Sequence, residues 1–228
     1  MVVDENVDAQ AHPTHTYIRR RGRLTKAQTR GLAQFRERYA VTAAAINESR
    51  GPVGVEIGFG MGQALCDWAQ ERPTWQLFGI ELYQPGIGGL CDRLSQLELE
   101  NVRIIEEPAQ AVLASLNEAC VDEYRIFFPD PWPKKRHLKR RLIQPAFVAE
   151  LARTLRTGGL LRLATDWAPY AEWMRECFAG QTALVARFDQ VRNASTEPAA
   201  DVGRDITKFE SRGERLGHDI HDLIYVKA

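Results

Sequence analysis

Short apolar runs alternate with amphipathic segments along the chain from residue 51 onward. The apolar runs predict five strands, at residues 53–57, 75–82, 102–105, 124–128 and 160–164. Helical spacing of hydrophobic positions predicts helices between and after them: one through Leu65 and Trp68, then 85–97, 109–116, one carrying Ile143, Phe147, Leu151 and Leu155, and 169–178. Pro145 falls in the first turn of the fourth helix, and Gly158-Gly159 is expected to end that helix.

This alternation is typical of an α/β fold with a mostly parallel sheet and helices on both faces. The C-terminal part differs, because the predicted strands at 184–188 and 223–226 are separated by polar residues 192–219. We expect an antiparallel closing pair there, with a long functional loop. Residues 1–16 predict a disordered tail, residues 17–50 a basic extension with a helix around Leu32, Phe35 and Tyr39, and residues 51–228 a single domain.

Charge is unevenly distributed, although the formal net charge is zero and argues against a general basic coat for nucleic acid. Residues 19–30 and residues 134–141 each hold six Lys or Arg and no acid. The four cysteines form no Cys-x-x-Cys, the N-terminus shows no secretory signal, and no apolar run reaches the ~20 residues that a membrane span needs. We therefore expect a soluble, cytoplasmic protein with free thiols and no membrane partner.

A glycine-rich turn follows the first predicted strand, with Gly58, Gly60 and Gly62 spaced as Gly-x-Gly-x-Gly. Such a turn between a strand and a helix lets a nucleotide-like ligand approach the backbone, and Glu81, 19 residues after Gly62, suits ribose hydroxyls. Glu56 would repel a pyrophosphate and attract a cation, so S-adenosylmethionine fits better than a dinucleotide. The alternative is a turn with a purely structural role.

Asp130 lies between prolines 129 and 131, after an apolar strand and beside Trp132. A carboxylate held in this way can accept hydrogen bonds from the Watson–Crick edge of guanine, and an aromatic side chain can stack on a base. Trp132 could equally pack in the core, and Asp130 could be a turn or cap residue. Asp166, like Glu81 and Asp130, follows a predicted strand, so all three acids are expected at one end of the sheet.

The basic run at 134–141 is either a solvated helix face or a surface for a phosphate backbone. Three other functions share part of this pattern. A methyltransferase acting on an exocyclic base nitrogen shares the acid between prolines and aromatics. A nicotinamide oxidoreductase conflicts with Glu56 and the glycine spacing. A non-catalytic RNA-binding module would need the basic patches but neither Glu81 nor Asp130.

These residues closely resemble the bacterial tRNA (guanine-N7)-methyltransferase family over about residues 51–228. The motifs that carry the resemblance are Val55 to Gly62, Gly79-Ile80-Glu81, Phe127 to Arg141, Thr165-Asp166-Trp167, Thr207 to Glu210, and Arg212 to His218. The resemblance implies a Rossmann-like methyltransferase fold with a mostly parallel seven-stranded sheet and an antiparallel C-terminal strand. It also implies methyl transfer from S-adenosylmethionine to N7 of guanine 46 in the tRNA variable loop.

The resemblance assigns roles residue by residue. Asp130 would be the catalytic acid, and the cofactor would contact Glu56, Gly58, Gly60, Gly62, Glu81, Glu107, Pro108 and Asp130. The substrate guanine and its surroundings would contact Lys134, Asp166, Thr207, Lys208, Phe209 and Glu210. RNA would contact Arg136, His137, Leu138, Lys139, Arg140 and Arg141. Pro108 departs from the family, which often has an acid at this position near the adenine, so Glu107 or backbone groups would have to substitute.

No metal is expected, because the spacing of His218, Asp219, His221 and Asp222 matches no known zinc pattern. Because N7 of guanine carries a lone pair and no proton, the implied reaction needs alignment and charge stabilisation rather than a strong base. The expected partner is tRNA, and the expected assembly is a monomer or weak homodimer.

Overall fold

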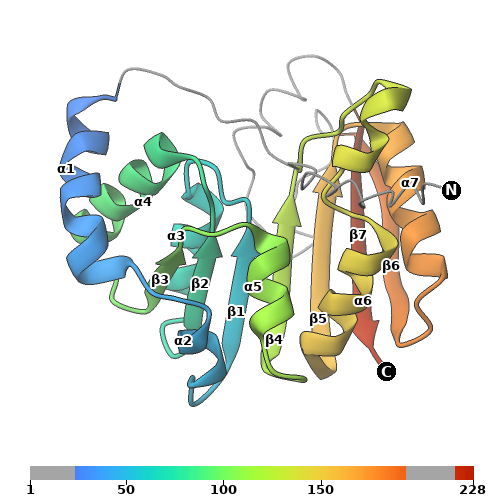
Figure 1. The fold of residues 1–228 in the computed structure, drawn as a ribbon, viewed down its shortest axis with the longest axis horizontal. Coiled ribbons are helices and arrows are strands. Elements are labelled where there is room, and N and C mark those ends of the chain that lie inside the picture. The colour runs from blue at the N-terminus through green and yellow to red at the C-terminus, as the bar shows by residue number, and fades with distance from the viewer. Residues whose placement is uncertain (1–23, 194–218) are drawn as a thin grey trace, which may run out of the picture.

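The computed structural model describes residues 24–193 and 219–228. Within these residues seven strands form one sheet in the order β3-β2-β1-β4-β5-β7-β6 (Figure 1). The strands are β1 (Val53–Ile57), β2 (Gln76–Ile80), β3 (Val102–Ile105), β4 (Val121–Phe127), β5 (Leu155–Thr165), β6 (Leu184–Asn193) and β7 (Asp219–Lys227). The first five strands are parallel, and β7 runs antiparallel between β5 and β6. The α/β fold class and the antiparallel closing pair are thereby confirmed.

Helices cover both faces of this sheet. They are α1 (Lys26–Gln34), the π-helix η1 (Phe35–Tyr39), α2 (Ala44–Asn47), α3 (Gln63–Glu71), α4 (Gln84–Gln96), α5 (Ala109–Ser115), the 3-10 helix η2 (Lys135–Arg140), α6 (Pro145–Thr154) and α7 (Ala168–Ala179). One core joins α5, α6 and α7 to the sheet, and a second joins α1, η1, α3 and α4 to the opposite face. Figure 1 shows α5 and α6 in front of the strands and α1 at the flank of the molecule, outside α4.

The alternation of side chains along β1 explains how both faces are buried. Val55 belongs to the first core, whereas a Cβ on Gly54 would lie 2.4 Å from the Trp68 ring of α3. Only glycine therefore lets α3 approach the strand this closely. The whole strand is buried, as expected for a central parallel strand.

The segment before β1 packs on the sheet domain through α1. Thr25 and Gln28 form a capping box at the start of α1, which satisfies free backbone N–H groups. The Arg30 guanidinium makes two hydrogen bonds to Asp92 of α4, at 2.6 and 2.8 Å. Within the predicted basic extension, the described residues therefore form a helix fixed against α4.

The helix predicted to end at Gly158-Gly159 ends earlier. It stops at Thr154, and Leu155 already pairs with Val121 as the first residue of β5. Leu155 continues the four-residue hydrophobic spacing of the helix, but its backbone pairs with β4 in the parallel sheet instead of extending α6. Both glycines lie inside β5, and Gly158 has a positive φ of 78°.

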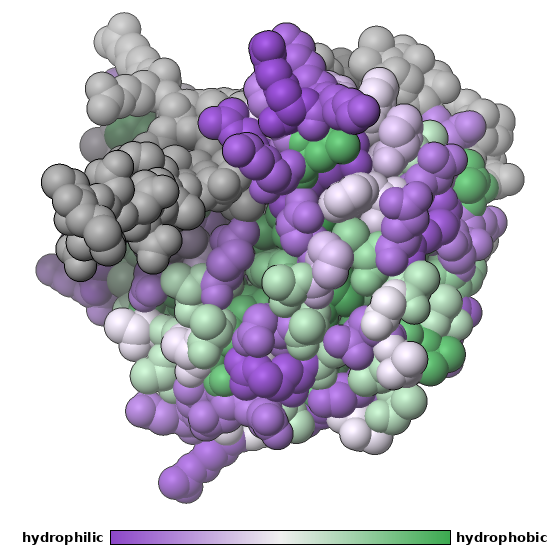
Figure 2. Space-filling model, turned by 45° about the vertical axis from the view of Figure 1, so that its right-hand side comes forward, coloured by the Kyte–Doolittle hydropathy of each residue, from purple (hydrophilic) through white to green (hydrophobic). Residues whose placement is uncertain are grey.

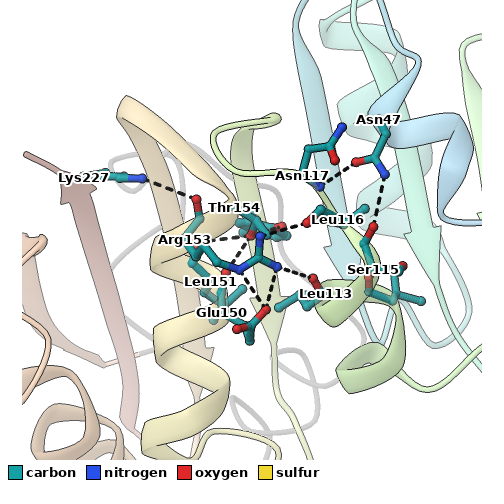
Figure 3. A network of polar contacts seen from close by, with 12 residues as sticks. Asn47, Leu113, Ser115, Leu116, Asn117, Glu150, Leu151, Arg153, Thr154 and Lys227 are labelled. Atoms are coloured by element: carbon teal, nitrogen blue, oxygen red, sulfur yellow. Dashed lines mark hydrogen bonds and ion pairs between the residues drawn. The ribbon is translucent and has the colours of Figure 1, made fainter.

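Polar contacts join α5, α6 and β7 at the amino-terminal end of the parallel strands, as Figure 3 shows. Arg153 donates to the backbone carbonyls of Leu116 and Leu113, at 2.8 and 2.9 Å, and pairs with Glu150. This arginine satisfies the Leu116 carbonyl just after α5 and gives a second donor to the Leu113 carbonyl, which already accepts the Leu116 N–H. No helix among the described residues is long and apolar enough to cross a membrane.

Candidate active site

A pocket of about 400 Å³ opens at the carboxyl ends of β1, β2, β3 and β4. Its wall is formed by the glycine-rich turn, by residues 80–83 after β2, by residues 107–109 after β3, and by residues 127–130 after β4. The sheet order reverses between β1 and β4, and this switch point is where open α/β sheets bind their ligands.

The glycine-rich turn adopts a conformation that only glycine takes without strain. Gly58, Gly60 and Gly62 have φ values of 76°, 55° and 74°. Gly62 is the left-handed residue that precedes α3, so the free N–H groups of that helix follow the turn directly. Helix α4 adds a further constraint, because a Cβ on Gly86 would lie 1.9 Å from the carbonyl oxygen of Gly60.

Glu56 is a buried carboxyl group immediately below this turn, with 3% of its surface exposed. The pKa of Glu56 is raised to about 8, chiefly by burial; Arg125 opposes this shift, and the charges of Glu81 and Asp67 add to it. The Oε2 atom of Glu56 has no hydrogen-bond partner. A buried acceptor without a donor is costly, and a ligand cation would supply the missing donor.

Glu81 follows β2 and lines the pocket. Its carboxylate accepts hydrogen bonds from three backbone N–H groups: Gly60 at 3.0 Å, Leu82 at 2.8 Å and Tyr83 at 3.0 Å. These bonds tie the glycine-rich turn to the end of β2. They also hold the acid at the position where the sequence predicted a ribose contact.

Glu107 and Pro108 both line the pocket, at the start of α5. Pro108 is the N-cap residue of that helix and offers no side-chain hydrogen bond. The adjacent Glu106 carboxylate accepts a hydrogen bond from the side chain of Gln84, at the N-terminus of α4. Glu107 is therefore the pocket-lining acid beside Pro108.

Asp130 lies in a loop whose backbone is strained on both sides of it. Phe128 and Trp132 have φ values of 50° and 43°, which bulky side chains rarely adopt. The Phe128 N–H donates to Ala164 on β5, at 2.8 Å. The neighbouring prolines predicted a rigid Asp130. The left-handed backbone conformation of Phe128 and Trp132 was not predicted from the sequence.

The remaining predicted substrate residues are distributed around this end of the sheet. Asp166 directly follows β5, the neighbour of β4, although it does not line the pocket. Lys134 is exposed and precedes η2. Thr207, Lys208, Phe209 and Glu210 lie outside the described residues, as does His218. Among the residues that are described, no three His, Cys, Asp or Glu side chains are grouped as they would be around a metal.

The basic run after the Asp130 loop forms the short helix η2. Lys135, Arg136 and Lys139 are exposed, and Arg140 lies with its guanidinium carbon 4.7 Å from the centre of the Trp132 ring. Some desolvation and the nearby cations lower the pKa of His137. Figure 2 shows hydrophilic side chains projecting at the top of the molecule, the end at which Figure 1 places this segment.

Three features of this region were not predicted from the sequence. Tyr83 and Leu142 line the pocket, although neither belongs to a pattern that marks a ligand site. Arg141, predicted to contact RNA, is buried with 4% exposure. Trp132, left open between base stacking and packing, has its ring covered by Arg140 and meets His137 edge-on.

Comparisons with known proteins identify the class to which this chain belongs. A family model described as "Putative methyltransferase" matches residues 50–223. A tRNA (guanine-N(7)-)-methyltransferase of Acidovorax sp. (strain JS42) is 41% identical, covering 95% of this chain and 88% of that protein. The 16S rRNA methyltransferase KamB has a similar structure, with a TM-score of 0.58, 16% identity, and coverage of 91% of this chain and 96% of that one.

A third comparison concerns the cofactor. A 16S rRNA (adenine(1408)-N(1))-methyltransferase from Catenulisporales acidiphilia, solved with its cosubstrate S-adenosylmethionine, has a TM-score of 0.55 at 15% identity, covering 82% of this chain and 90% of that one. The fold and the matching family model define a Rossmann-like, S-adenosylmethionine-dependent methyltransferase. The full-length similarity then narrows the class, and the chain belongs to the bacterial tRNA (guanine-N(7)-)-methyltransferase family.

Proposed function

We propose that this protein transfers a methyl group from S-adenosylmethionine to N7 of guanine 46 in the variable loop of tRNA. The observation that carries the proposal is the pocket between the glycine-rich turn and the Asp130 loop, in a chain that belongs to this family. Its two ends differ in chemistry. One end offers carboxylates and a glycine-rich turn, and the other offers a strained acidic loop followed by cations.

The residues around the glycine-rich turn fit the cofactor. Glu56 holds a buried oxygen without a donor, which suits the ammonium group of the methionine part. Glu81 lines the pocket and is proposed to bind the ribose hydroxyls, and the turn lets the ligand approach the backbone. Glu107 and the apolar ring of Pro108 border the part of the pocket that remains for the adenine. When bound, S-adenosylmethionine supplies a methyl group made electrophilic by its sulfonium.

Asp130 is proposed as the acid that faces the guanine. The lone pair of N7 is already available, so the protein gains rate by aligning the reacting atoms and excluding water. The guanine ring becomes cationic during the reaction, and a fixed carboxylate stabilises that charge. Lys134, Asp166 and residues 207–210 are proposed to hold the base and its neighbouring nucleotides.

The helix η2 is proposed to bind the tRNA backbone through Arg136, Lys139 and Arg140. His137 and Leu138 lie on the same helix and complete this surface. Phosphate contacts release counterions, so binding through η2 is expected to weaken steeply as salt rises.

The proposal is tested by incubating the protein with isotope-labelled S-adenosylmethionine and unmodified tRNA, followed by mass spectrometry of the digested nucleosides. We expect labelled N7-methylguanosine, and no label in a tRNA in which guanine 46 is replaced by adenine. Labelled N6-methyladenosine, or N7-methylguanosine that persists in the replaced tRNA, would contradict the proposal. A protein that binds tRNA but transfers no label would be an RNA-binding module instead.

A further inference from the structure

Arg141 is a buried cation that pairs with no carboxylate of the described residues. Its side chain is 4% exposed, and no ion pair involves it in the part of the chain that the structure describes. Burial lowers the pKa of the Arg141 guanidinium, which is the direction expected for a desolvated cation. A buried charge is retained at a cost in stability, so its contacts deserve a functional explanation.

The guanidinium contacts the loop that carries Asp130. The Nε–H of Arg141 donates a 2.9 Å hydrogen bond to the carbonyl oxygen of Pro131, the residue immediately after Asp130. On the other side of Asp130, the Phe128 N–H is bound to the carbonyl of Ala164 on β5. The acid therefore lies between two anchored points of the chain.

These anchors hold a backbone that would otherwise relax. Phe128 and Trp132 both have left-handed φ values, which are unfavourable for aromatic residues and persist only where the surroundings impose them. The hydrogen bond from Arg141 lies one residue before Trp132. Loss of this bond would free the second half of the loop to leave its strained conformation.

Helix α7 fixes Arg141 in turn. The guanidinium carbon lies 4.8 Å from the centre of the Tyr170 ring and 5.5 Å from that of Trp173. Aromatic faces stabilise a desolvated cation. Both aromatic residues are locked to the chain beside Arg141: the Ile143 N–H donates to the Tyr170 hydroxyl at 3.3 Å, and the Trp173 Nε1–H donates to the Ile143 carbonyl at 2.7 Å.

We propose that Arg141 is a positioning residue that transmits the rigidity of α7 to the Asp130 loop, rather than a phosphate contact of the RNA surface. The inference rests on the proposed function for its kinetic consequence, but its structural consequence can be measured without any turnover.

The kinetic test compares Arg141→Met with Arg141→Lys. The methionine variant keeps the packing but has no donor, and we expect kcat to fall 10- to 100-fold, as misplacement of reacting groups by about 1 Å can do. Cofactor Kd, KM for tRNA and the salt dependence of tRNA binding should stay within threefold of wild type. The lysine variant retains a charge and a donor and should recover part of the lost kcat.

Arg153→Met is the matched control. Arg153 also donates to backbone carbonyls, at the opposite end of the strands (Figure 3), so this variant should lose stability but keep wild-type kcat. Wild-type kcat in Arg141→Met would overturn the proposal. A salt dependence of tRNA binding that is weaker than wild type by about one phosphate contact would also overturn the proposal, because it would show that Arg141 contacts the RNA. If the methionine variant does not fold, the lysine variant should still lower kcat, because lysine has no Nε–H at the position that bonds to the Pro131 carbonyl, and wild-type kcat in that variant would overturn the proposal.

The structural test uses the indole N–H signals of the protein's five tryptophans, recorded by NMR on ¹⁵N-labelled samples. Arg141→Met should shift or broaden the signals of Trp173 and Trp132, and leave those of Trp68 and Trp75 in the other core unchanged. A change confined to Trp173 would show that the loop does not depend on Arg141 and would overturn the proposal. If wild type transfers no methyl group, the proposed function fails while this test still decides on Arg141.

Discussion

Replacement of Glu56 by glutamine should affect stability and cofactor binding in opposite directions. The carboxyl group is buried beneath the glycine-rich turn, and its pKa is raised to about 8 from an ordinary value of 4.5. The unfolded chain therefore releases this proton near pH 4.5, whereas the folded protein keeps it until about pH 8. Between these values the unfolded state binds fewer protons, so the stability of the free protein falls as pH rises.

The size of the effect follows from the shift. Each pKa unit corresponds to about 1.4 kcal/mol, so the carboxyl destabilises the free protein by on the order of 3 kcal/mol at pH 7. Glutamine removes this pH-dependent cost but buries an amide, which takes back about 1–2 kcal/mol. Urea unfolding of Glu56→Gln should thus show a stability advantage over wild type that grows between pH 5 and pH 8.

Cofactor affinity should change in the other direction. Loss of a charge-assisted hydrogen bond to the ammonium group costs about 1.5–3 kcal/mol, or roughly a 10- to 150-fold rise in Kd. Wild-type Glu56 must release its proton to make this contact. The affinity of the wild-type protein for the cofactor should therefore rise between pH 6 and 7, where the ammonium group of the ligand stays charged. The affinity of Glu56→Gln should not change over this range. Calorimetric titration with S-adenosylmethionine measures both.

Glu150→Gln is the control for binding, because Glu150 lies on α6 in the network around Arg153. It should leave cofactor affinity unchanged. An unchanged Kd in Glu56→Gln would refute the assignment of Glu56 to the ammonium group. A stability difference independent of pH would refute the account of its burial.

Three further predictions concern the loop, the RNA surface and the turn. Asp130→Ala should lower turnover about 100-fold, equivalent to ~3 kcal/mol in the barrier, and wild-type turnover would remove Asp130 from the mechanism. Arg136→Glu with Lys139→Glu should weaken tRNA binding and flatten its log–log salt dependence, and an unchanged slope would exclude phosphate contacts there. Gly86→Ala should raise the cofactor Kd at least tenfold, because the added Cβ would lie 1.9 Å from a carbonyl oxygen of the glycine-rich turn. Gly180→Ala, whose added Cβ would lie 4.0 Å from the nearest atom, should leave the cofactor Kd unchanged. Equal affinities of the two variants for the cofactor would contradict the packing argument.

The sequence predicted most of the sheet and much of the pocket. Glu81 and Asp130 could be brought together in advance because parallel strands place their carboxyl ends at the same edge, whatever helices lie between them. The apolar run at Val53–Ile57 predicted both boundaries of β1 correctly. Local patterns of this kind survive folding because burial on both faces acts on every residue of the strand.

Other features depend on contacts that no local pattern contains. Arg141 stands in a run of cations, and only α7, about thirty residues later, provides the aromatic faces that bury it. Leu155 fits the helical spacing but joins β5, because pairing with β4 competes with one more residue of helix. The left-handed backbone at Trp132 likewise depends on the surrounding loop, since nothing in its residue type predicts a positive φ.

A structure of the protein with S-adenosylhomocysteine and tRNA tests the central claim most directly. The account predicts the amino group of the ligand beside Glu56, its ribose at Glu81, and N7 of guanine 46 in line with the sulfur on the Asp130 side of the pocket. A ligand bound elsewhere on the sheet, or a guanine held away from the Asp130 loop, would contradict it.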